Sequence, residues 1–255
     1  MNPASYESEQ VLSEYLLFHY GKAEEILPYD FGPAEALDYP ARVVRECIQV
    51  SRLSSKARAL DLGCAVGRSS FELARFCASV VGIDASERFI HAANALKKEG
   101  CVVFDFTEEG ELKTKTLAQV PAGIDPSRVS FEVGDACNVK KELGTFDVVL
   151  MSNLIDRLPD PASCLSRIHE RIHPQGQLIV SSPYTWLSRF TPKDCWLGGV
   201  ERNGKKVRSE EALFEILGPH FDFAGKKDLP FLIREHSRKF QWGVSQATVW
   251  IRKES

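Results

Sequence analysis

The feature that most constrains the fold of this chain is the stretch ALDLGCAVGRSS at residues 59–70. It opens with apolar residues typical of a buried strand and then enters a turn bounded by Gly63 and Gly67, where the backbone can bend sharply. From Arg68 to Cys77 the apolar residues return at the spacing of a helix. A strand, a glycine-rich turn and a helix in this order are expected to present backbone N–H groups and a helix N-terminus to a ligand.

The rest of the chain alternates between strand-like and helix-like segments, which predicts an α/β fold. Apolar runs bounded by turn residues predict strands, and amphipathic segments between them predict helices on both faces of a parallel sheet. Two alternating segments at the end of the chain predict an antiparallel finish. The expected fold is Rossmann-like, with a seven-stranded, mostly parallel sheet whose last strand is antiparallel. The expected strands are 57–62, 79–83 (closing on Asp84), 129–133, 146–151, 177–181, 229–236 and 245–252.

The 255 residues are expected to form one domain, because the sequence shows no linker, repeat or change of composition. Residues 1–55 precede the first strand and contain two amphipathic stretches, 8–20 and 38–52, which predict a helical cap. Residues 56–255 form the core. Within it, the segment 102–120 alternates like two strands around a turn and is expected to be an inserted β-hairpin.

The composition limits the kinds of partner. The net charge is −3, so the chain lacks the basic character of a nucleic-acid-binding protein. No apolar run reaches the length of a membrane span. The seven cysteines form no CxxC pair, so no metal site is expected. Cys64 and Cys77 fall in predicted core elements, which indicates reduced thiols and a cytoplasmic location.

Acidic residues near the ends of three predicted strands narrow the choice of ligand. The turn lacks both the third glycine of a dinucleotide fingerprint and the lysine of a phosphate loop. Asp61 would repel a pyrophosphate but accept a hydrogen bond from an ammonium group, while Asp84 lies where a carboxylate binds a ribose diol. Asp135 lies where an acid can bind the exocyclic amine of adenine. The pattern predicts S-adenosylmethionine; the alternative is a structural turn without a ligand.

Four motifs occur in order along the chain: DLGCAVG at 61–67, GID at 82–84, GDA at 134–136 and FDVVLMSNLIDRL at 146–158. With these motifs the chain resembles the class I S-adenosylmethionine-dependent methyltransferases. The resemblance implies methyl transfer with S-adenosylhomocysteine as the spent cofactor. The cofactor-binding residues that it implies are Asp61, Gly63, Cys64, Ala65, Gly67, Asp84, Ala85, Asp135, Ala136, Asn153 and Leu154.

Further segments narrow the resemblance. They are YLLFHYG at 15–21, LPYDFGP at 27–33, DLGCAVGRSSFELAR at 61–75, GDACN at 134–138, SNLIDRL at 152–158, SPYTWL at 182–187 and FLIREHSRKFQWGVSQATVW at 231–250. With them the chain resembles the thiohistidine N-methyltransferases of ovothiol biosynthesis. The resemblance implies methyl transfer to the imidazole N-π of 5-thiohistidine, which gives ovothiol A. It also implies a sulfoxide synthase on a separate chain as a functional partner.

A zwitterionic amino-acid substrate needs aromatic walls, a cation for its carboxylate and an acid for its amine. The candidate catalytic residues are Tyr20, Asp156 and Tyr184, and His19 is a further candidate base or a packed helix residue. The candidate substrate-binding residues are Tyr29, Arg157, Trp186, Arg234 and Lys239. Each also has a structural interpretation: the aromatic residues pin loops, Asp156 pairs with Arg157, and the other cations form a solvated charge group.

Two other functions fit the same residues. One is a methyltransferase for another small imidazole or amino-acid substrate. The other is a catalytically silent cofactor-binding partner of a sulfoxide synthase. The glycines and acidic residues of the cofactor motifs are intact, which argues against a loss of cofactor binding but not against a loss of turnover.

Overall fold

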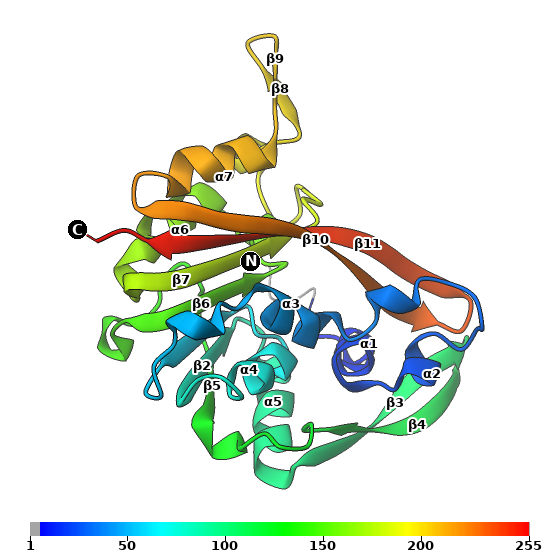
Figure 1. The fold of residues 1–255 in the computed structure, drawn as a ribbon. Coiled ribbons are helices and arrows are strands. Elements are labelled where there is room, and N and C mark those ends of the chain that lie inside the picture. Colours follow the sequence, from blue (N-terminus) through cyan, green and yellow to red (C-terminus); the bar gives the residue numbers. More distant parts are fainter. Residues whose placement is uncertain (1–5, 255) are drawn as a thin grey trace.

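The computed structural model describes residues 6–254; the first five residues of the expected cap and the last residue of the chain lie outside this range. Seven strands form the central sheet: β1 (Arg58–Leu62), β2 (Ser79–Asp84), β5 (Val129–Val133), β6 (Phe146–Ser152), β7 (Ile172–Ser182), β10 (Phe221–His236) and β11 (Lys239–Arg252). Their order is β10-β11-β7-β6-β1-β2-β5 (Figure 1). The strands from β7 to β5 are parallel, whereas β11 is antiparallel to both β7 and β10. The predicted Rossmann-like sheet with an antiparallel last strand is therefore confirmed.

Helices cover both faces of the sheet (Figure 1). They are α1 (Glu9–Tyr20), α2 (Ala23–Ile26), α3 (Tyr39–Cys47), α4 (Arg68–Leu73), α5 (Glu87–Glu99), α6 (Pro161–Arg167) and α7 (Ser209–Leu217). Side chains alternate along β1, so Ala59 packs with α1, α3, α4 and α5, while Leu60 and Leu62 pack with α6 and α7. Both faces of the sheet are thus buried, as the apolar parallel strands require. Among residues 6–254, no helix is long and apolar enough to cross a membrane.

The expected insertion is present as a separate hairpin of β3 (Cys101–Glu109) and β4 (Leu112–Gln119). Phe104 and Phe106 of β3 are buried in the core that α1 shares with the sheet. The Ser13 hydroxyl of α1 donates a hydrogen bond to the Asp105 carbonyl oxygen. The long β10–β11 hairpin extends beyond the sheet toward α1 and β3 (Figure 1). These contacts hold α1 across one end of the sheet.

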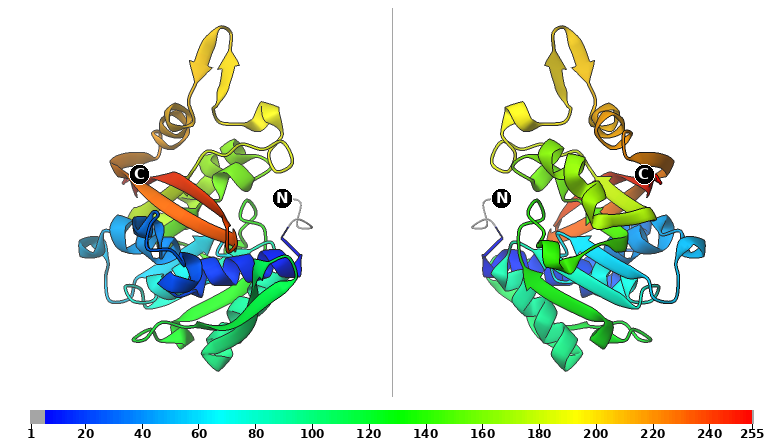
Figure 2. Two further views of the ribbon diagram at one scale, coloured as in Figure 1. Left: turned by 90° about the vertical axis from the view of Figure 1, so that its right-hand side faces the viewer. Right: turned by 90° about the vertical axis from the view of Figure 1, so that its left-hand side faces the viewer.

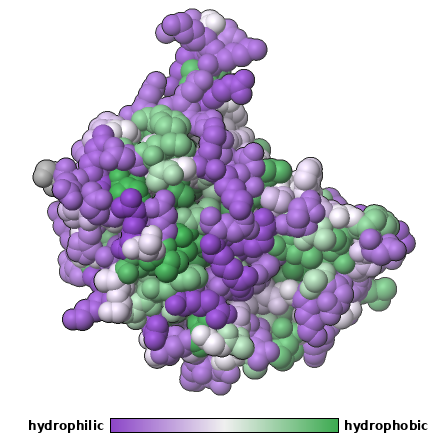
Figure 3. Space-filling view, viewed as in Figure 1, coloured by the Kyte–Doolittle hydropathy of each residue, from purple (hydrophilic) through white to green (hydrophobic). Residues whose placement is uncertain are grey.

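A second small hairpin, β8 (Val200–Arg202) and β9 (Lys205–Val207), lies where the sequence predicts no strand. It projects from the body of the protein (Figure 2). Its tip is hydrophilic (Figure 3). The sequence ERNGKK lacks the apolar alternation that marks a strand packed on a core, so the hairpin gave no signal.

Two predicted helices end earlier than expected. The helix that begins near residue 38 ends at Cys47, because Ile48 is extended with ψ 130°. The helix that begins at Arg68 ends at Leu73 rather than near Cys77. The last turn of this helix tightens, with the Phe76 N–H bonded to the Leu73 carbonyl oxygen at 2.9 Å, because the chain must reverse into β2.

Other predicted boundaries were also wrong. The spacing of Leu165, Ile168 and Ile172 predicts one helix through all three, but Ile172 begins β7, where it is fully buried and paired with Phe146. The sequence also predicts Ser209 as a helix cap, whereas it is the first residue of α7. The last two strands begin earlier than predicted, at Phe221 in β10 and at Lys239 in β11. The missed part of β10 includes Gly225, a residue that weakens the strand signal and that an edge strand tolerates.

Candidate active site

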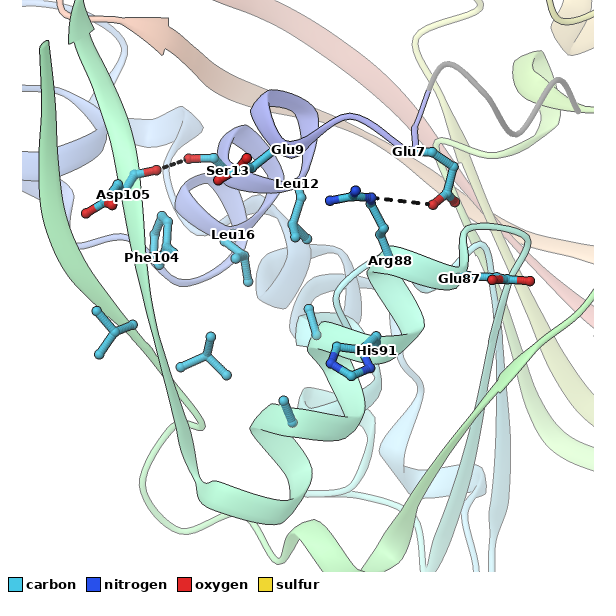
Figure 4. Close-up of a pocket in the computed structure, with 14 residues that line it drawn as sticks. Glu7, Glu9, Leu12, Ser13, Leu16, Glu87, Arg88, His91, Phe104 and Asp105 are labelled. Atoms are coloured by element: carbon cyan, nitrogen blue, oxygen red, sulfur yellow. Dashed lines mark hydrogen bonds and ion pairs between the residues drawn. The ribbon is translucent and has the colours of Figure 1, made fainter. Parts of the chain in front are cut away.

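The molecule has two hollows beside α1, one on each face of that helix. The outer groove, of about 840 Å³, lies between α1, α5 and β3, and Leu12, Leu16 and Phe104 are among its lining residues (Figure 4). The inner cavity, of about 480 Å³, is lined at one end by residues that follow β1, β2 and β6. Ligands of doubly wound sheets bind outside the carboxyl ends of the strands, which are absent from the walls of the outer groove. The inner cavity is therefore the candidate active site.

The glycine turn after β1 forms one wall of the inner cavity. Gly63 has φ +73°, and a Cβ atom on it would lie 2.8 Å from Cδ1 of Leu154. Gly67 has φ +86°, and a Cβ atom there would lie 2.5 Å from Cζ of Phe131. Gly63 lines the cavity, whereas Gly67 is not among its lining residues. The first glycine thus leaves space beside the cavity, and the second leaves space for the packing of α4 on the sheet.

The N–H groups of this turn are bonded within the protein, contrary to the expectation that they face a ligand. Gly63 and Cys64 donate to the carbonyl oxygen of Ile83 at 2.8 and 3.1 Å, and Gly67 donates to that of Cys64 at 2.9 Å. The Ala65 N–H donates to the Asp84 carboxylate at 3.0 Å. A phosphate cradle needs such groups free, so this arrangement favours a ligand without phosphates at the turn.

Asp84 at the end of β2 is the buried acid of the cavity wall. One carboxylate oxygen accepts from the Ser86 N–H at 2.9 Å and the other accepts from the Ala65 N–H at 3.0 Å. Burial raises the pKa of Asp84, and these backbone hydrogen bonds act in the opposite direction. Each oxygen keeps a lone pair for a further donor. A ribose diol supplies two such donors, so Asp84 and the open face of Gly63 fit an adenosyl cofactor.

Asp61 lies behind the turn and is not among the lining residues of the cavity. Its carboxylate is buried and accepts a hydrogen bond from the Ser70 hydroxyl of α4 at 2.6 Å. Burial raises the pKa of Asp61 to about 7. The structure therefore places Asp61 where it fixes the turn against α4, and not in contact with the cavity.

Three other residues implied as cofactor contacts also lie outside the cavity lining, namely Ala85, Asp135 and Ala136. Asp135 is exposed and closes a local turn, since its carboxylate accepts from the Cys137 N–H at 2.9 Å and from the Asn138 amide at 2.6 Å. Cys64, Ala65, Asn153 and Leu154 do line the cavity. Some of the predicted cofactor-binding residues thus lie around Asp84 in the cavity wall. Asp135 and Ala136, which were predicted to contact the adenine, lie outside the lining of the cavity.

Asn153 follows β6 and has φ +50°, which is uncommon for a residue other than glycine. Its Oδ1 atom accepts hydrogen bonds from the Tyr39 hydroxyl and the Ser245 hydroxyl, each at 2.8 Å. Its own N–H donates to the Ser181 carbonyl oxygen at 2.9 Å. Side chains from α3, β7 and β11 thus fix the position of Asn153 in the cavity wall.

Among the predicted substrate-binding residues, the structure brings only Arg157 to the inner cavity. Its Nη1 atom donates to the Asp156 carboxylate at 2.9 Å and to the Thr185 carbonyl oxygen at 3.0 Å. Asp156 is fully buried and also accepts from the Thr185 N–H at 3.0 Å. Burial raises the pKa of Asp156, and the charge of Arg157 lowers it. Asp156 thus lies behind Arg157 and orients it, which matches the ion-pair interpretation.

The remaining predicted residues have polar groups bonded to other parts of the protein. The hydroxyls of Tyr20, Tyr29 and Tyr184 donate to the Val66 carbonyl oxygen, the Ser237 carbonyl oxygen and the Gln246 amide oxygen, each at 2.8 Å. Trp186 donates to the Ser209 hydroxyl at 2.9 Å. Arg234 pairs with Glu108, and Lys239 pairs with Glu235 at 2.7 Å. None of these residues is among those that line the cavity.

Sequence reasoning missed most of the wall opposite the glycine turn. The apolar stripe of α1 predicts only a helix of the cap, yet Tyr15 and Phe18 line the cavity. His19, a candidate base or packed helix residue, also lines it. Tyr39 of α3 and Phe231 of β10 join them, with ring centroids 5.5 Å apart. Further lining residues that were missed are Tyr6, Phe89, Arg189, Phe190, Ile233 and Gln241. The only signal in the sequence was the density of aromatic residues in α1, which a core helix shares.

The mouth of the cavity carries two cations around one aromatic ring. The guanidinium carbons of Arg157 and Arg189 each lie 4.9 Å from the centroid of Phe190. All three residues line the cavity. Guanidinium groups bind carboxylates in bidentate geometry, so this cluster is suited to an anionic group on a ligand.

A family described as a methyltransferase domain matches residues 53–225, more than half of the chain. A ubiquinone biosynthesis O-methyltransferase from Ralstonia nicotianae is 27% identical over 153 residues, which are 60% of this chain and 53% of that protein. The chain spans about half the length of the curated relatives it matches.

Solved structures share the fold. The magnesium protoporphyrin IX methyltransferase (ChlM) from Synechocystis PCC 6803, with bound S-adenosylhomocysteine, superposes with a TM-score of 0.59 at 17% identity over 98% of both chains. The N-methyltransferase NodS from Bradyrhizobium japonicum, also in complex with S-adenosylhomocysteine, has a TM-score of 0.51 at 18% identity. That match covers 93% of this chain and 100% of NodS.

Proposed function

The chain belongs to the methyltransferase domain family, and we propose that it methylates the π nitrogen of the imidazole ring of 5-thiohistidine to give ovothiol A. Membership of the family makes it an S-adenosylmethionine-dependent methyltransferase that acts on a small molecule. The acceptor is the proposed part. It is supported by the residues that surround the inner cavity and by the loop segments that resemble thiohistidine N-methyltransferases.

The observation that carries the proposal is that different parts of the chain line the two ends of the cavity. Gly63, Ala65, Asp84 and Asn153 lie within the family match at residues 53–225. The aromatic wall of Tyr15, Phe18, His19, Tyr39 and Phe231 lies outside it. The shared part of the chain thus supplies the cofactor end, and segments outside the family match supply the aromatic wall that faces the acceptor. An aromatic wall favours a flat ring as the acceptor.

The size and charge of the cavity favour a small zwitterion. Its volume of about 480 Å³ falls in the lower half of the roughly 300–1,000 Å³ that is usual for ligand sites, and it must hold cofactor and acceptor together. Arg157 and Arg189 are suited to a carboxylate. Glu14, which also lines the cavity, is suited to an ammonium group. A ring amino acid carries all three features.

S-adenosylmethionine supplies an activated methyl group on a sulfonium, so the residues of the chain mainly position and desolvate the reactants. Asp84 holds the ribose hydroxyls, and the Asn153 backbone lies beside the methionine end. Asp156 holds Arg157 toward the acceptor carboxylate. In this proposal Tyr20 and Tyr184, whose hydroxyls are bonded to the protein, shape the site and do not exchange protons with the acceptor.

The wider setting belongs to the same proposal. The 255 residues act as a single domain, in which residues 6–55 of the helical cap supply part of the wall of the inner cavity. A sulfoxide synthase on a separate chain supplies the sulfur-containing substrate. The reduced cysteines are those of a cytoplasmic protein.

A second candidate acceptor is another small imidazole or amino acid, since the aromatic wall and the Arg157 cluster do not themselves select the ring sulfur. The curated relatives are named as O-methyltransferases of ubiquinone biosynthesis, so a hydroxyl group is another acceptor class to be tested. A catalytically silent cofactor-binding subunit is the third candidate.

One assay separates these functions. The protein is incubated with S-adenosylmethionine and one of three acceptors in parallel reactions: 5-thiohistidine, histidine or a small catechol. The mass of each product is measured by mass spectrometry. Addition of one methyl to 5-thiohistidine, with much slower reaction of histidine, is the expected result. Equal rates on histidine favour the second candidate, and binding of S-adenosylhomocysteine without turnover favours the third. The absence of any thiohistidine product would overturn the proposal.

A further inference from the structure

His19 in the last turn of α1 is a polar residue that the site described so far does not use. Its side chain lines the inner cavity and is 8% exposed. The Nδ1 atom is buried and has no hydrogen-bond partner among the described residues. Buried polar atoms in folded proteins are nearly always paired, so this nitrogen requires an explanation.

The surroundings of His19 are aromatic. Its ring centroid lies 5.3 Å from that of Phe18, 5.9 Å from that of Tyr15 and 6.3 Å from that of Tyr20. Phe18 in turn stacks on Tyr39 at 6.1 Å. The imidazole is therefore the polar element in an otherwise apolar part of the wall, and that part belongs to α1 and α3, outside the family match. This position places His19 at the acceptor end of the cavity.

The protonation state of His19 limits what it can do. Burial and the positive charge of Arg68 lower its pKa to about 3. The ring is thus neutral at physiological pH and too weak a base to remove a proton from an acceptor. A neutral imidazole has one donor nitrogen and one acceptor nitrogen. His19 is therefore equipped to orient a polar ring by a hydrogen bond.

We propose that Nδ1 of His19 accepts a hydrogen bond from the τ N–H of the acceptor ring and so directs methylation to nitrogen instead of sulfur. The inference rests on the proposed function. In 5-thiohistidine the sulfur is attached to the carbon beside the τ nitrogen, so a hydrogen bond at that nitrogen holds the sulfur on the α1 side. The π nitrogen then faces the cofactor end of the cavity.

The transfer step balances once one proton has left the neutral acceptor for solvent, which leaves a ring thiolate, a proton on the τ nitrogen and a free lone pair on the π nitrogen. The lone pair of the π nitrogen forms the new N–C bond, and the electron pair of the broken methyl–sulfur bond stays on the sulfur of the departing S-adenosylhomocysteine. The τ N–H keeps its proton and its hydrogen bond to His19 throughout. The positive charge that the ring gains is offset by the ring thiolate.

The test compares His19→Phe, which keeps an aromatic ring without an acceptor, with His19→Asn, whose amide oxygen lies near the position of Nδ1. His91→Phe is the matched control, because His91 lies on α5 beside the outer groove (Figure 4). The ratio of N-methyl to S-methyl product is measured by NMR with saturating 5-thiohistidine. The affinity for S-adenosylhomocysteine and the melting temperature are measured on the same samples.

His19→Phe is expected to lower the N-to-S product ratio, and to raise KM for 5-thiohistidine, on the order of tenfold, as loss of one hydrogen bond implies. His19→Asn is expected to restore part of the ratio, and His91→Phe to leave it unchanged. A merely structural role would change the melting temperature without changing the product ratio.

Two results would overturn the inference alone: an unchanged ratio and KM in His19→Phe, or a loss of S-adenosylhomocysteine affinity in that variant as large as its effect on KM. The second result would place His19 against the cofactor. A wild-type protein that binds S-adenosylhomocysteine but does not methylate 5-thiohistidine refutes the proposed function, and this inference with it.

Discussion

Replacing Asp84 with asparagine is expected to weaken cofactor binding without harming the fold. The carboxylate already accepts hydrogen bonds from the Ser86 and Ala65 N–H groups at 2.9 and 3.0 Å, and its remaining lone pairs are available to the ribose hydroxyls. A hydrogen bond to a charged group contributes about 1.5–3 kcal/mol. Since 1.4 kcal/mol corresponds to a factor of ten, the Kd for S-adenosylhomocysteine is expected to rise about 10- to 150-fold.

The effect of Asp84→Asn on the stability of the fold has a separate cause from its effect on cofactor binding. Burial raises the pKa of Asp84 in the folded protein. The stability that this group contributes is therefore present at low pH and is lost as the pH rises through the folded pKa. A neutral amide removes this loss, but it has one acceptor for the two backbone N–H groups, so one N–H loses its partner. The two effects act in opposite directions, and at neutral pH the variant is expected to melt close to the wild type.

Isothermal titration calorimetry with S-adenosylhomocysteine and a thermal melt check both expectations. Asp125→Asn is the control, because Asp125 is exposed and accepts from the Ser127 N–H in a comparable local turn, remote from the cavity lining. An Asp84→Asn variant that melts normally and binds with wild-type affinity would refute the assignment of the ribose to Asp84. A variant that loses affinity because it unfolds would refute the stability argument.

Three further substitutions test the site. Asp61→Asn keeps an acceptor for the Ser70 hydroxyl. Because burial raises the pKa of Asp61 from 3.8 to about 7, the stability of the wild type falls as the pH rises between these values. The melting temperature of the variant should change less across that range, and an equal change of melting temperature with pH in both proteins would contradict the shifted pKa. Asp156→Asn removes the ion pair behind Arg157, so KM for the acceptor should rise about tenfold with little change in S-adenosylhomocysteine affinity, and the reverse pattern would count against Asp156 as a positioning residue. Gly67→Ala brings a Cβ atom within 2.5 Å of Phe131 at φ +86° and should cost about 1–3 kcal/mol of unfolding free energy in urea titrations; wild-type stability with weakened cofactor binding would instead make Gly67 a ligand contact.

The sheet was predictable because its signals are local. Apolar runs bounded by turn residues marked β1, β2, β5 and β6 almost to the residue. β1, β2 and β6 are buried on both faces, which leaves few polar positions to blur their ends, whereas β5 at the sheet edge is marked by alternation. The edge strand β10 was only half predicted, because Gly225 is tolerated at an edge but interrupts the strand pattern in the missed half. The β8–β9 hairpin left no trace, since it packs on nothing that would impose an apolar face.

Residues of the candidate site were predictable only where the end of a predicted strand determines their position. Gly63 and Asp84 follow directly from strand ends, so their place in the cavity could be inferred from the strands. The direction of a tyrosine side chain has no such signal. Tyr20 and Tyr15 lie on the same helix, yet the Tyr20 hydroxyl is bonded to Val66 while Tyr15 lines the cavity. Their roles depend on the packing of α1, which the sequence of α1 does not contain.

The position of α1 between the two hollows explains why membership of the family determines the donor and leaves the acceptor open. One face of the helix, with Leu12 and Leu16, borders the outer groove, and the other, with Tyr15 and His19, borders the inner cavity. In the proposed function, the strand-end turns within residues 53–225 hold the cofactor and must keep their geometry for any acceptor. A change on the inner face of α1 alters only what meets the methyl group. Relatives that share the turns but differ in this helix are therefore expected to share the donor and differ in the acceptor.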